Sequence, residues 1–125
     1  MDVKAKLYLV SGEGEKFMGI GVLWLLQQIE ESGSLRAAAG SMGISYSKAY
    51  NMVKNLEHQI GVPVIERKRG GADHEGSSLT RFGQQFVVLY DEFQTEAKRR
   101  LVEPFDVFSR EFQALLSEFA HTDKE

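Results

Sequence analysis

A run of polar side chains between residues 45 and 55 combines hydroxyls, amides and lysines that can bind bases and phosphates. These residues are Ser45, Tyr46, Ser47, Lys48, Tyr50, Asn51, Lys54 and Asn55. Residues 32–56 contain no Asp or Glu, whereas a face that only meets solvent usually mixes acids with lysines. An acid facing a polyanion would meet phosphate charge without releasing a counterion. The pattern therefore favours contact with double-stranded DNA over the alternative of a merely solvated helix face.

Two kinds of DNA contact are expected from this sequence. Asn51 suits a bidentate pair with adenine, and the nearby hydroxyls can reach bases or phosphates. A second basic feature is the run Arg67-Lys68-Arg69, where the following glycines allow close approach to phosphates or a minor groove. Asp73 and Glu75 partly offset its charge. The predicted DNA contacts outside residues 45–54 are Arg36, Arg67, Lys68, Arg69 and Arg81.

Catalysis and cofactor binding find little support in the sequence. The chain has no cysteine, which excludes thiolate nucleophiles, disulfides and cysteine metal sites. His58, His74 and His121 are scattered, without the regular spacing of zinc ligands. The glycines between residues 12 and 21 are not followed by the Gly-Lys-Ser/Thr of a phosphate loop. We therefore expect no enzyme activity, no metal and no cofactor.

The composition is that of an ordinary globular protein. A length of 125 residues with 42% hydrophobic residues fits one domain with room for an appended helix. The net charge of −3 arises in the C-terminal third, because residues 91–125 carry five basic and nine acidic side chains. The longest apolar stretch, residues 22–26, is far shorter than the ~20 residues that span a bilayer. The N-terminus lacks a secretory signal pattern, so a soluble, cytoplasmic protein is expected.

A tight turn between two short helices must position the polar run. Ser34 is a good N-cap for the first of these helices, and Ser45 is a good N-cap for the second. Ala39 is small enough for two helix backbones to approach closely, and Gly43 tolerates the positive φ that such a turn needs. The second helix is expected to close at Gly61. Any tight helical hairpin shares these features, but a helix-turn-helix is favoured.

The remaining periodicities predict a mainly α fold with small β-sheets, arranged as a winged helix-turn-helix. A first helix is expected from residue 21 to residue 32, with a buried stripe at Val22, Leu25, Leu26 and Ile29. We expect a DNA-binding domain over residues 1–80 and C-terminal helices over residues 81–125. The predicted strands are 4–10, 15–18, 64–68 and 78–80, and a long helix starts near residue 80.

An apolar line through the C-terminal helices predicts a homodimer. The line breaks at residues 102–104 and resumes with steps of three and four residues, the spacing of a heptad seam that packs against a partner helix. Packing against the first helix of the same chain is the alternative. A second candidate function is a winged-helix scaffold for protein contacts that uses these Phe-rich helices. The predicted dimer contacts are Phe86, Leu89, Phe93, Phe105, Phe108 and Phe112.

The sequence resembles the DNA-binding domain of the molybdate-responsive regulator (ModE) family, whose winged helix is related to the LysR-type regulators. The resemblance covers roughly residues 4 to 100 and implies a homodimer in which the long helix after the wing makes much of the interface. It is carried by Gly33-Ser34-Leu35, Ala37-Ala38-Ala39, Met42-Gly43-Ile44-Ser45-Tyr46, Ala49-Tyr50, Val64-Ile65-Glu66-Arg67, Gly70-Gly71 and Leu79-Thr80-Arg81-Phe82-Gly83.

Three features depart from that family. Full-length members carry strand-rich C-terminal domains that bind molybdate, whereas the roughly 25 residues after the long helix look helical here, so no molybdate site is expected in this chain. Residues 72–75 replace part of a wing that is richer in glycine. Tyr50 stands where the reading helix of the family usually has Trp.

Overall fold

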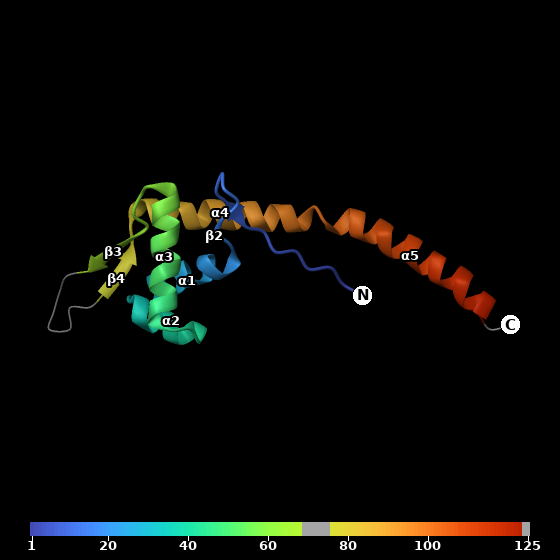
Figure 1. The fold of residues 1–125 in the computed structure, drawn as a ribbon, viewed down its shortest axis with the longest axis horizontal. Helices are drawn as coiled ribbons and strands as arrows, with labels where there is room; N and C mark the ends of the chain where they lie inside the picture. The colour runs from blue at the N-terminus through green and yellow to red at the C-terminus, as the bar shows by residue number, and fades with distance from the viewer. Residues whose placement is uncertain (69–75, 124–125) are drawn as a thin grey trace. The chain divides into compact units, whose positions relative to one another are not determined.

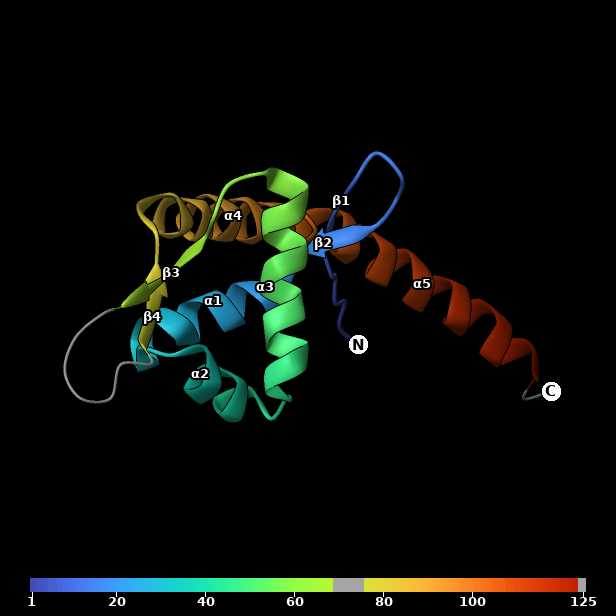
Figure 2. The same cartoon turned by 60° about the vertical axis from the view of Figure 1, so that its left-hand side comes forward.

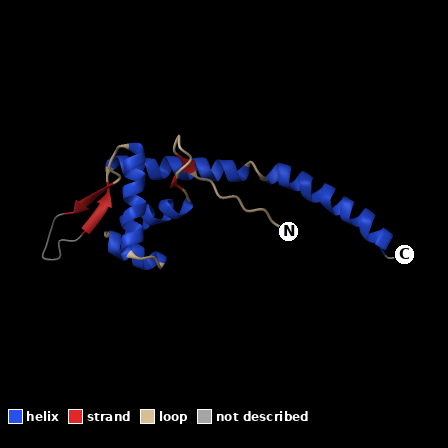
Figure 3. Ribbon diagram, in the orientation of Figure 1, coloured by secondary structure: helices blue, strands red, loops and turns tan. Residues whose placement is uncertain are grey.

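The structure is a computed structural model that describes residues 1–68 and 76–123, with the backbone alone for Lys68 and residues 121–123. The chain divides into two compact units, Lys6–Glu92 and Met1–Ala5 with Phe93–Glu125. Helices predominate, and each small sheet has two strands (Figures 1 and 3). The elements are β1 (Leu9–Val10), β2 (Lys16–Met18), α1 (Ile20–Ser32), α2 (Leu35–Met42), α3 (Tyr46–Ile60), β3 (Ile65–Lys68), β4 (Gly76–Leu79), α4 (Arg81–Arg99) and α5 (Val102–Asp123).

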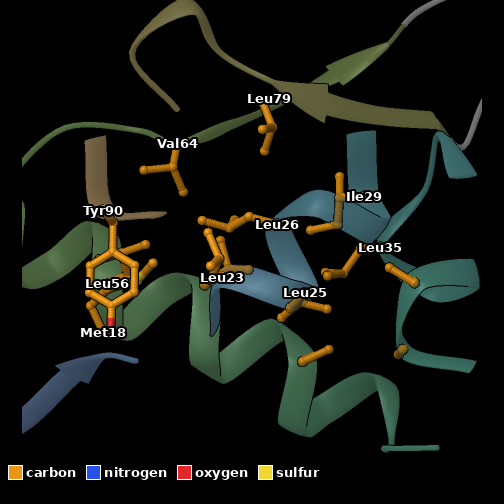
Figure 4. Close-up of a cluster of buried hydrophobic side chains, with 14 residues drawn as sticks. Met18, Leu23, Leu25, Leu26, Ile29, Leu35, Leu56, Val64, Leu79 and Tyr90 are labelled. Carbon is orange, nitrogen blue, oxygen red and sulfur yellow. The ribbon is translucent and has the colours of Figure 1, made fainter. Parts of the chain in front are cut away.

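Helices α1, α2 and α3 enclose the core of the first unit (Figure 4). Leu25, Leu26 and Ile29 are fully buried, which confirms most of the predicted α1 stripe. The exception is Val22, which is half-buried, while its neighbour Leu23 is buried in its place. The remaining core residues are Met18, Leu35, Ala38, Ala39, Ala49, Val53, Leu56, Val64, Leu79 and Tyr90.

The predicted helix caps are confirmed. The Ser34 hydroxyl accepts a hydrogen bond from the Ala37 amide at 2.9 Å, and the Ser45 hydroxyl accepts one from the Lys48 amide at 3.0 Å. Gly43 has a φ of 69°, in the left-handed region that glycine adopts without a steric cost. The turn between α2 and α3 is therefore set by its cap residues, and it fixes the direction in which α3 leaves α2.

The first strand of the N-terminal hairpin, β1, is shorter than the strand predicted over residues 4–10. Only Leu9 and Val10 pair with β2, and the register shifts between them. Leu7 is held differently, because its carbonyl oxygen accepts a hydrogen bond from the Tyr90 hydroxyl on α4 at 2.9 Å. Burial of that hydroxyl raises the pKa of Tyr90 above its ordinary value, and the nearby Tyr8 raises it further. The alternation in the sequence could not reveal this long-range contact.

The wing is an antiparallel pair of strands that is tied to the helices. Ile65 pairs with Leu79 and Lys68 with Gly76, so the return strand starts two residues earlier than the predicted 78–80. The Ser77 amide donates to the Gly33 carbonyl at 2.7 Å, which joins β4 to the end of α1. The predicted wing tip at Arg69 and residues 70–75 lies outside the described residues.

Thr80 connects the wing to α4. Its hydroxyl donates to the Pro63 carbonyl and accepts from the Gly83 amide, each at 2.9 Å. α4 then runs to Arg99, and the helix breaks at residues 100–101, slightly before the predicted 102–104. Pro104 falls in the first turn of α5 as expected, where a missing amide hydrogen costs no helical bond.

Ion pairs mark the end of α4. Glu96 accepts hydrogen bonds from Arg99 at 2.6 Å and from Arg100 at 3.0 Å. These two bonds hold the pKa of Glu96 below its ordinary value.

Within the described residues, no helix has the length and apolar character needed to cross a membrane.

Candidate nucleic-acid interface

The outward stripe of α3 is defined here as Ser47, Asn51 and Lys54. These positions follow one another by four and three residues and therefore lie on one face of the helix. All three are exposed, whereas Ala49 and Val53 on the opposite face are fully buried. In Figure 2, α3 lies in front of α1, and no described helix or strand of the unit Lys6–Glu92 is drawn in front of α3. The face predicted to bind bases is thus available for contact with another molecule.

Two stacked tyrosines lie beside the outward stripe. The rings of Tyr46 and Tyr50 have centroids 6.3 Å apart, and both side chains are exposed. The Arg36 guanidinium lies 4.7 Å from the centre of the Tyr46 ring, and the Lys54 ammonium lies 5.5 Å from that of Tyr50. Cation–π contacts of this kind hold a positive charge over an aromatic face. Arg36 of α2 and Lys54 of α3 therefore each lie over a tyrosine ring beside the outward stripe.

A small open pocket of about 140 Å³ brings three elements of the first unit together. Arg36 of α2, Tyr46 of α3 and Arg67 of β3 all line it, although they are far apart in sequence. Two of the predicted cations thus meet beside the N-terminal end of α3. Such an arrangement can bind a phosphate group, because both guanidiniums are permanently charged hydrogen-bond donors.

Glu57 is the first acid after the acid-free segment, and its carboxylate binds groups within the protein. Its carboxylate accepts hydrogen bonds from the amides of Val64 at 2.8 Å and Ile65 at 3.3 Å. The other carboxylate oxygen pairs with Lys54 at 3.3 Å. This acid connects α3 to the start of the wing, so it helps to hold the two elements in their relative positions. The sequence indicated where the acid-free run ends but not this contact.

The other predicted contacts are distributed around this site. Ser45 is exposed, and its hydroxyl oxygen already caps α3. Lys48 is exposed on the side of α3 that faces the N-terminal hairpin, and Arg81 is exposed at the first residue of α4. The Lys68 side chain and Arg69 lie outside what the structure describes. Asn55, grouped with the polar face above, instead donates its amide to the Lys16 carbonyl at 3.2 Å.

The predicted dimer contacts differ in exposure. Phe86 is half-buried against the core and stacks on Phe82 with ring centroids 5.9 Å apart, whereas Leu89 is 67% exposed. Phe93 is also exposed. On α5, Phe108 is exposed and stacks on the half-buried rings of Phe105 and Phe112. The centroid separations from Phe108 are 6.5 Å to Phe105 and 5.5 Å to Phe112.

A three-helix core, a tight turn before an exposed third helix, and a two-stranded wing together define the winged helix-turn-helix class. The model of the family described as "Bacterial regulatory helix-turn-helix protein, lysR family" matches residues 21–84, just over half of the chain. The chain belongs to this family. This confirms the resemblance noted from the turn and wing residues.

Two curated relatives are ModE proteins. The chain is 36% identical over 67 residues to the "Transcriptional regulator ModE" of Yersinia pestis, and 37% identical over 67 residues to the "DNA-binding transcriptional dual regulator ModE" of Escherichia coli K12. Each match covers 54% of this chain but only 26% of the relative. The similarity therefore concerns about a quarter of each of these longer proteins.

Solved structures share the fold. The complex of the CbnR DNA-binding domain (DBD) with DNA matches with a TM-score of 0.54 and 26% identity, over 66% of this chain and 90% of that one. The BenM DBD, solved with benA site 1 DNA, has a TM-score of 0.53 at 19% identity, over 72% of this chain and 96% of that one. The latter likeness concerns the fold alone.

Proposed function

We propose that this chain is a transcriptional regulator that binds double-stranded DNA sequence-specifically as a homodimer. The observation that carries the proposal is the exposed outward stripe of α3 within a segment that contains no acid. Membership of the LysR family and the likeness to a domain solved in complex with DNA support it. The role requires no catalytic step, and the proposal includes no enzyme activity and no cofactor.

The N-terminal half of α3 enters the major groove in this proposal. Asn51 and Ser47 then face base edges, where an Asn amide pairs with adenine. Arg36 and Arg67 bind phosphates beside the groove, since phosphate contacts set the position of the protein while base contacts set its specificity. Tyr46 and Tyr50 add hydroxyl donors next to the same stripe. Lys48, Lys54, Lys68, Arg69 and Arg81 complete the proposed cationic contacts.

The homodimer is proposed to form through residues 81–125, with residues 1–80 as the DNA-binding part. Exposed apolar side chains on α4 and α5 support this division, because a helix with an apolar row tends to bury it against a partner. Two-fold symmetry places the two copies of α3 about one DNA turn apart, ~34 Å, and favours a palindromic site. The protein acts in the cytoplasm in this proposal.

No molybdate site is assigned to the described residues. The ModE relatives are much longer than the matched segment. Residues 102–123 of this chain form one helix rather than a strand-rich module. We therefore restrict the proposal to DNA binding and dimerisation by residues 1–125.

A titration of labelled duplex DNA at several salt concentrations tests the proposal. The logarithm of the affinity should fall by about 0.9 per log unit of salt for each phosphate neutralised. A selection from random duplexes should then return a palindromic consensus sequence. Failure to bind any duplex, genomic fragments included, would contradict the proposal and favour the scaffold function of the Phe-rich helices.

A further inference from the structure

A cationic groove lies on the side of α3 away from the wing. The N-terminal hairpin, the start of α1 and one side of α3 line an open groove of about 440 Å³. Lys6, Lys16 and Lys48 contribute three positive charges to it, and Tyr8 and Met52 contribute apolar surface. Among the described residues that line the groove there is no Asp or Glu. Nothing in the residue pattern suggested that these three lysines would meet.

The hairpin is held firmly against the helices. The Asn55 amide on α3 donates to the Lys16 carbonyl at 3.2 Å, and Met18 at the end of β2 is buried in the core. The Lys16 ammonium lies 4.3 Å from the centre of the Tyr8 ring, which keeps this cation at the groove. Glu13 and Glu15 are exposed in and beside the turn of the hairpin and do not line the groove.

The position of the groove relative to α3 suggests its ligand. With 100° between successive residues of a helix, Lys48 and Asn55 fall on one side of the outward stripe, and Tyr46 and Tyr50 fall on the other. Figures 1 and 2 agree with this assignment, since β3 and β4 lie on one side of α3 and β2 lies on the other. A helix in the major groove has one sugar–phosphate strand on each side.

We infer that Lys6, Lys16 and Lys48 form a phosphate-binding site. It binds the DNA strand that lies across the major groove from the strand beside the wing. This inference rests on the proposed function and adds a second set of phosphate contacts beside α3. Arg36 and Arg67 bind one DNA strand, and Lys6, Lys16 and Lys48 bind the other. Phosphate contacts on both sides then hold α3 in the major groove of the DNA. The contact is to phosphates alone and does not depend on base sequence.

The test compares two charge-matched double variants of the full chain on a mixed-sequence duplex. K6Q/K16Q removes two charges from the groove, and K98Q/R110Q removes two charges from helix faces opposite the Phe lines of α4 and α5. In the proposed homodimer the double variant loses two phosphate contacts from each copy, so the magnitude of its salt slope should fall by about 4, and its affinity should fall about tenfold per lost contact near 0.1 M salt. K98Q/R110Q should match the unchanged chain, and K16R should retain the Lys16 contribution.

Phosphate ethylation interference then locates the lost contacts. On the selected palindromic site, K6Q/K16Q should lose interference on one strand of each half-site, and R67Q should lose it on the opposite strand of the same half-site. Circular dichroism and thermal melting check that each variant is folded. If the unchanged chain binds DNA but K6Q/K16Q keeps the full salt slope and every interference position, the inference is wrong while the proposed function stands. If the unchanged chain binds no duplex, both are wrong.

Discussion

At the scale of single residues, the candidate interface depends on which polar side chains of α3 are hydrogen-bonded within the protein and which are exposed for contact with DNA. Asn51 and Asn55 are both amides on α3, and the sequence placed them on the same polar face. The structure separates them, because the Asn55 amide binds the Lys16 carbonyl while Asn51 lies on the exposed outward stripe. The two residues therefore form a matched pair for testing base recognition.

Asn51→Ala should weaken binding to the preferred site by roughly 1–3 kcal/mol and relax the preference at one base pair. The physical reason is the loss of a bidentate amide contact to a base edge. Asn55→Ala is the control, and it should leave the base preference unchanged. Competition binding against a panel of single-base-pair substitutions measures both effects. A uniform loss over all sequences for Asn51→Ala would show that this residue does not read a base.

At the scale of elements, the site depends on how the wing and α4 are joined to the helical core. The Val64 carbonyl accepts the Thr80 amide at 2.9 Å, and the Val64 amide donates to the carboxylate of Glu57 on α3. Gly83 lies directly against the same carbonyl, so that an added Cβ would overlap its oxygen. The Leu-Thr-x-x-Gly pattern thus reflects a close contact between two backbones, which holds α3, the wing and α4 together.

Gly83→Ala should therefore destabilise the protein by about 1–3 kcal/mol, because overpacking forces the backbone to shift. Gly40→Ala is the matched control: Gly40 lies within α2, and an added Cβ there meets nothing within 4 Å. Alanine has the higher helix propensity, so Gly40→Ala should be neutral or stabilising by up to ~1 kcal/mol. Urea unfolding measures both changes. Equal stability of the two variants would contradict the proposed close contact.

At the scale of the whole molecule, the proposed regulator requires two copies. Leu89 and Val88 are neighbours on α4, and both are exposed, at 67% and 55%. Only Leu89 continues the apolar line through Phe86 and Phe93, at spacings of three and four residues. Dimerisation through this line would bury Leu89 and leave Val88 in water.

Leu89→Glu should therefore weaken the dimer, whereas Val88→Glu should not. A buried Leu contributes about 1.5–3 kcal/mol, and a two-fold interface contains it twice, so the dissociation constant should rise at least ~100-fold. Sedimentation velocity over a range of protein concentrations measures the change. If both variants dimerise as tightly as the unchanged chain, residue 89 lies outside the interface.

The sequence by itself determined the elements, because the signals that define them are local. Ser34 and Ser45 as caps, Gly43 with positive φ, and the apolar stripes of three helices depend on residues a few positions apart. These signals were enough to predict the order of helices and wing, the exposed polar face of α3 and the family resemblance.

Only the tertiary structure decided which of these residues meet. The contacts of Tyr90 with Leu7, of Asn55 with Lys16, and of Arg36, Tyr46 and Arg67 around one pocket join segments far apart in the chain. Local periodicity carries no information on such distances, since it records which face of an element is apolar and not what covers it. The groove formed by Lys6, Lys16 and Lys48 could be recognised only after the hairpin and α3 had been brought side by side.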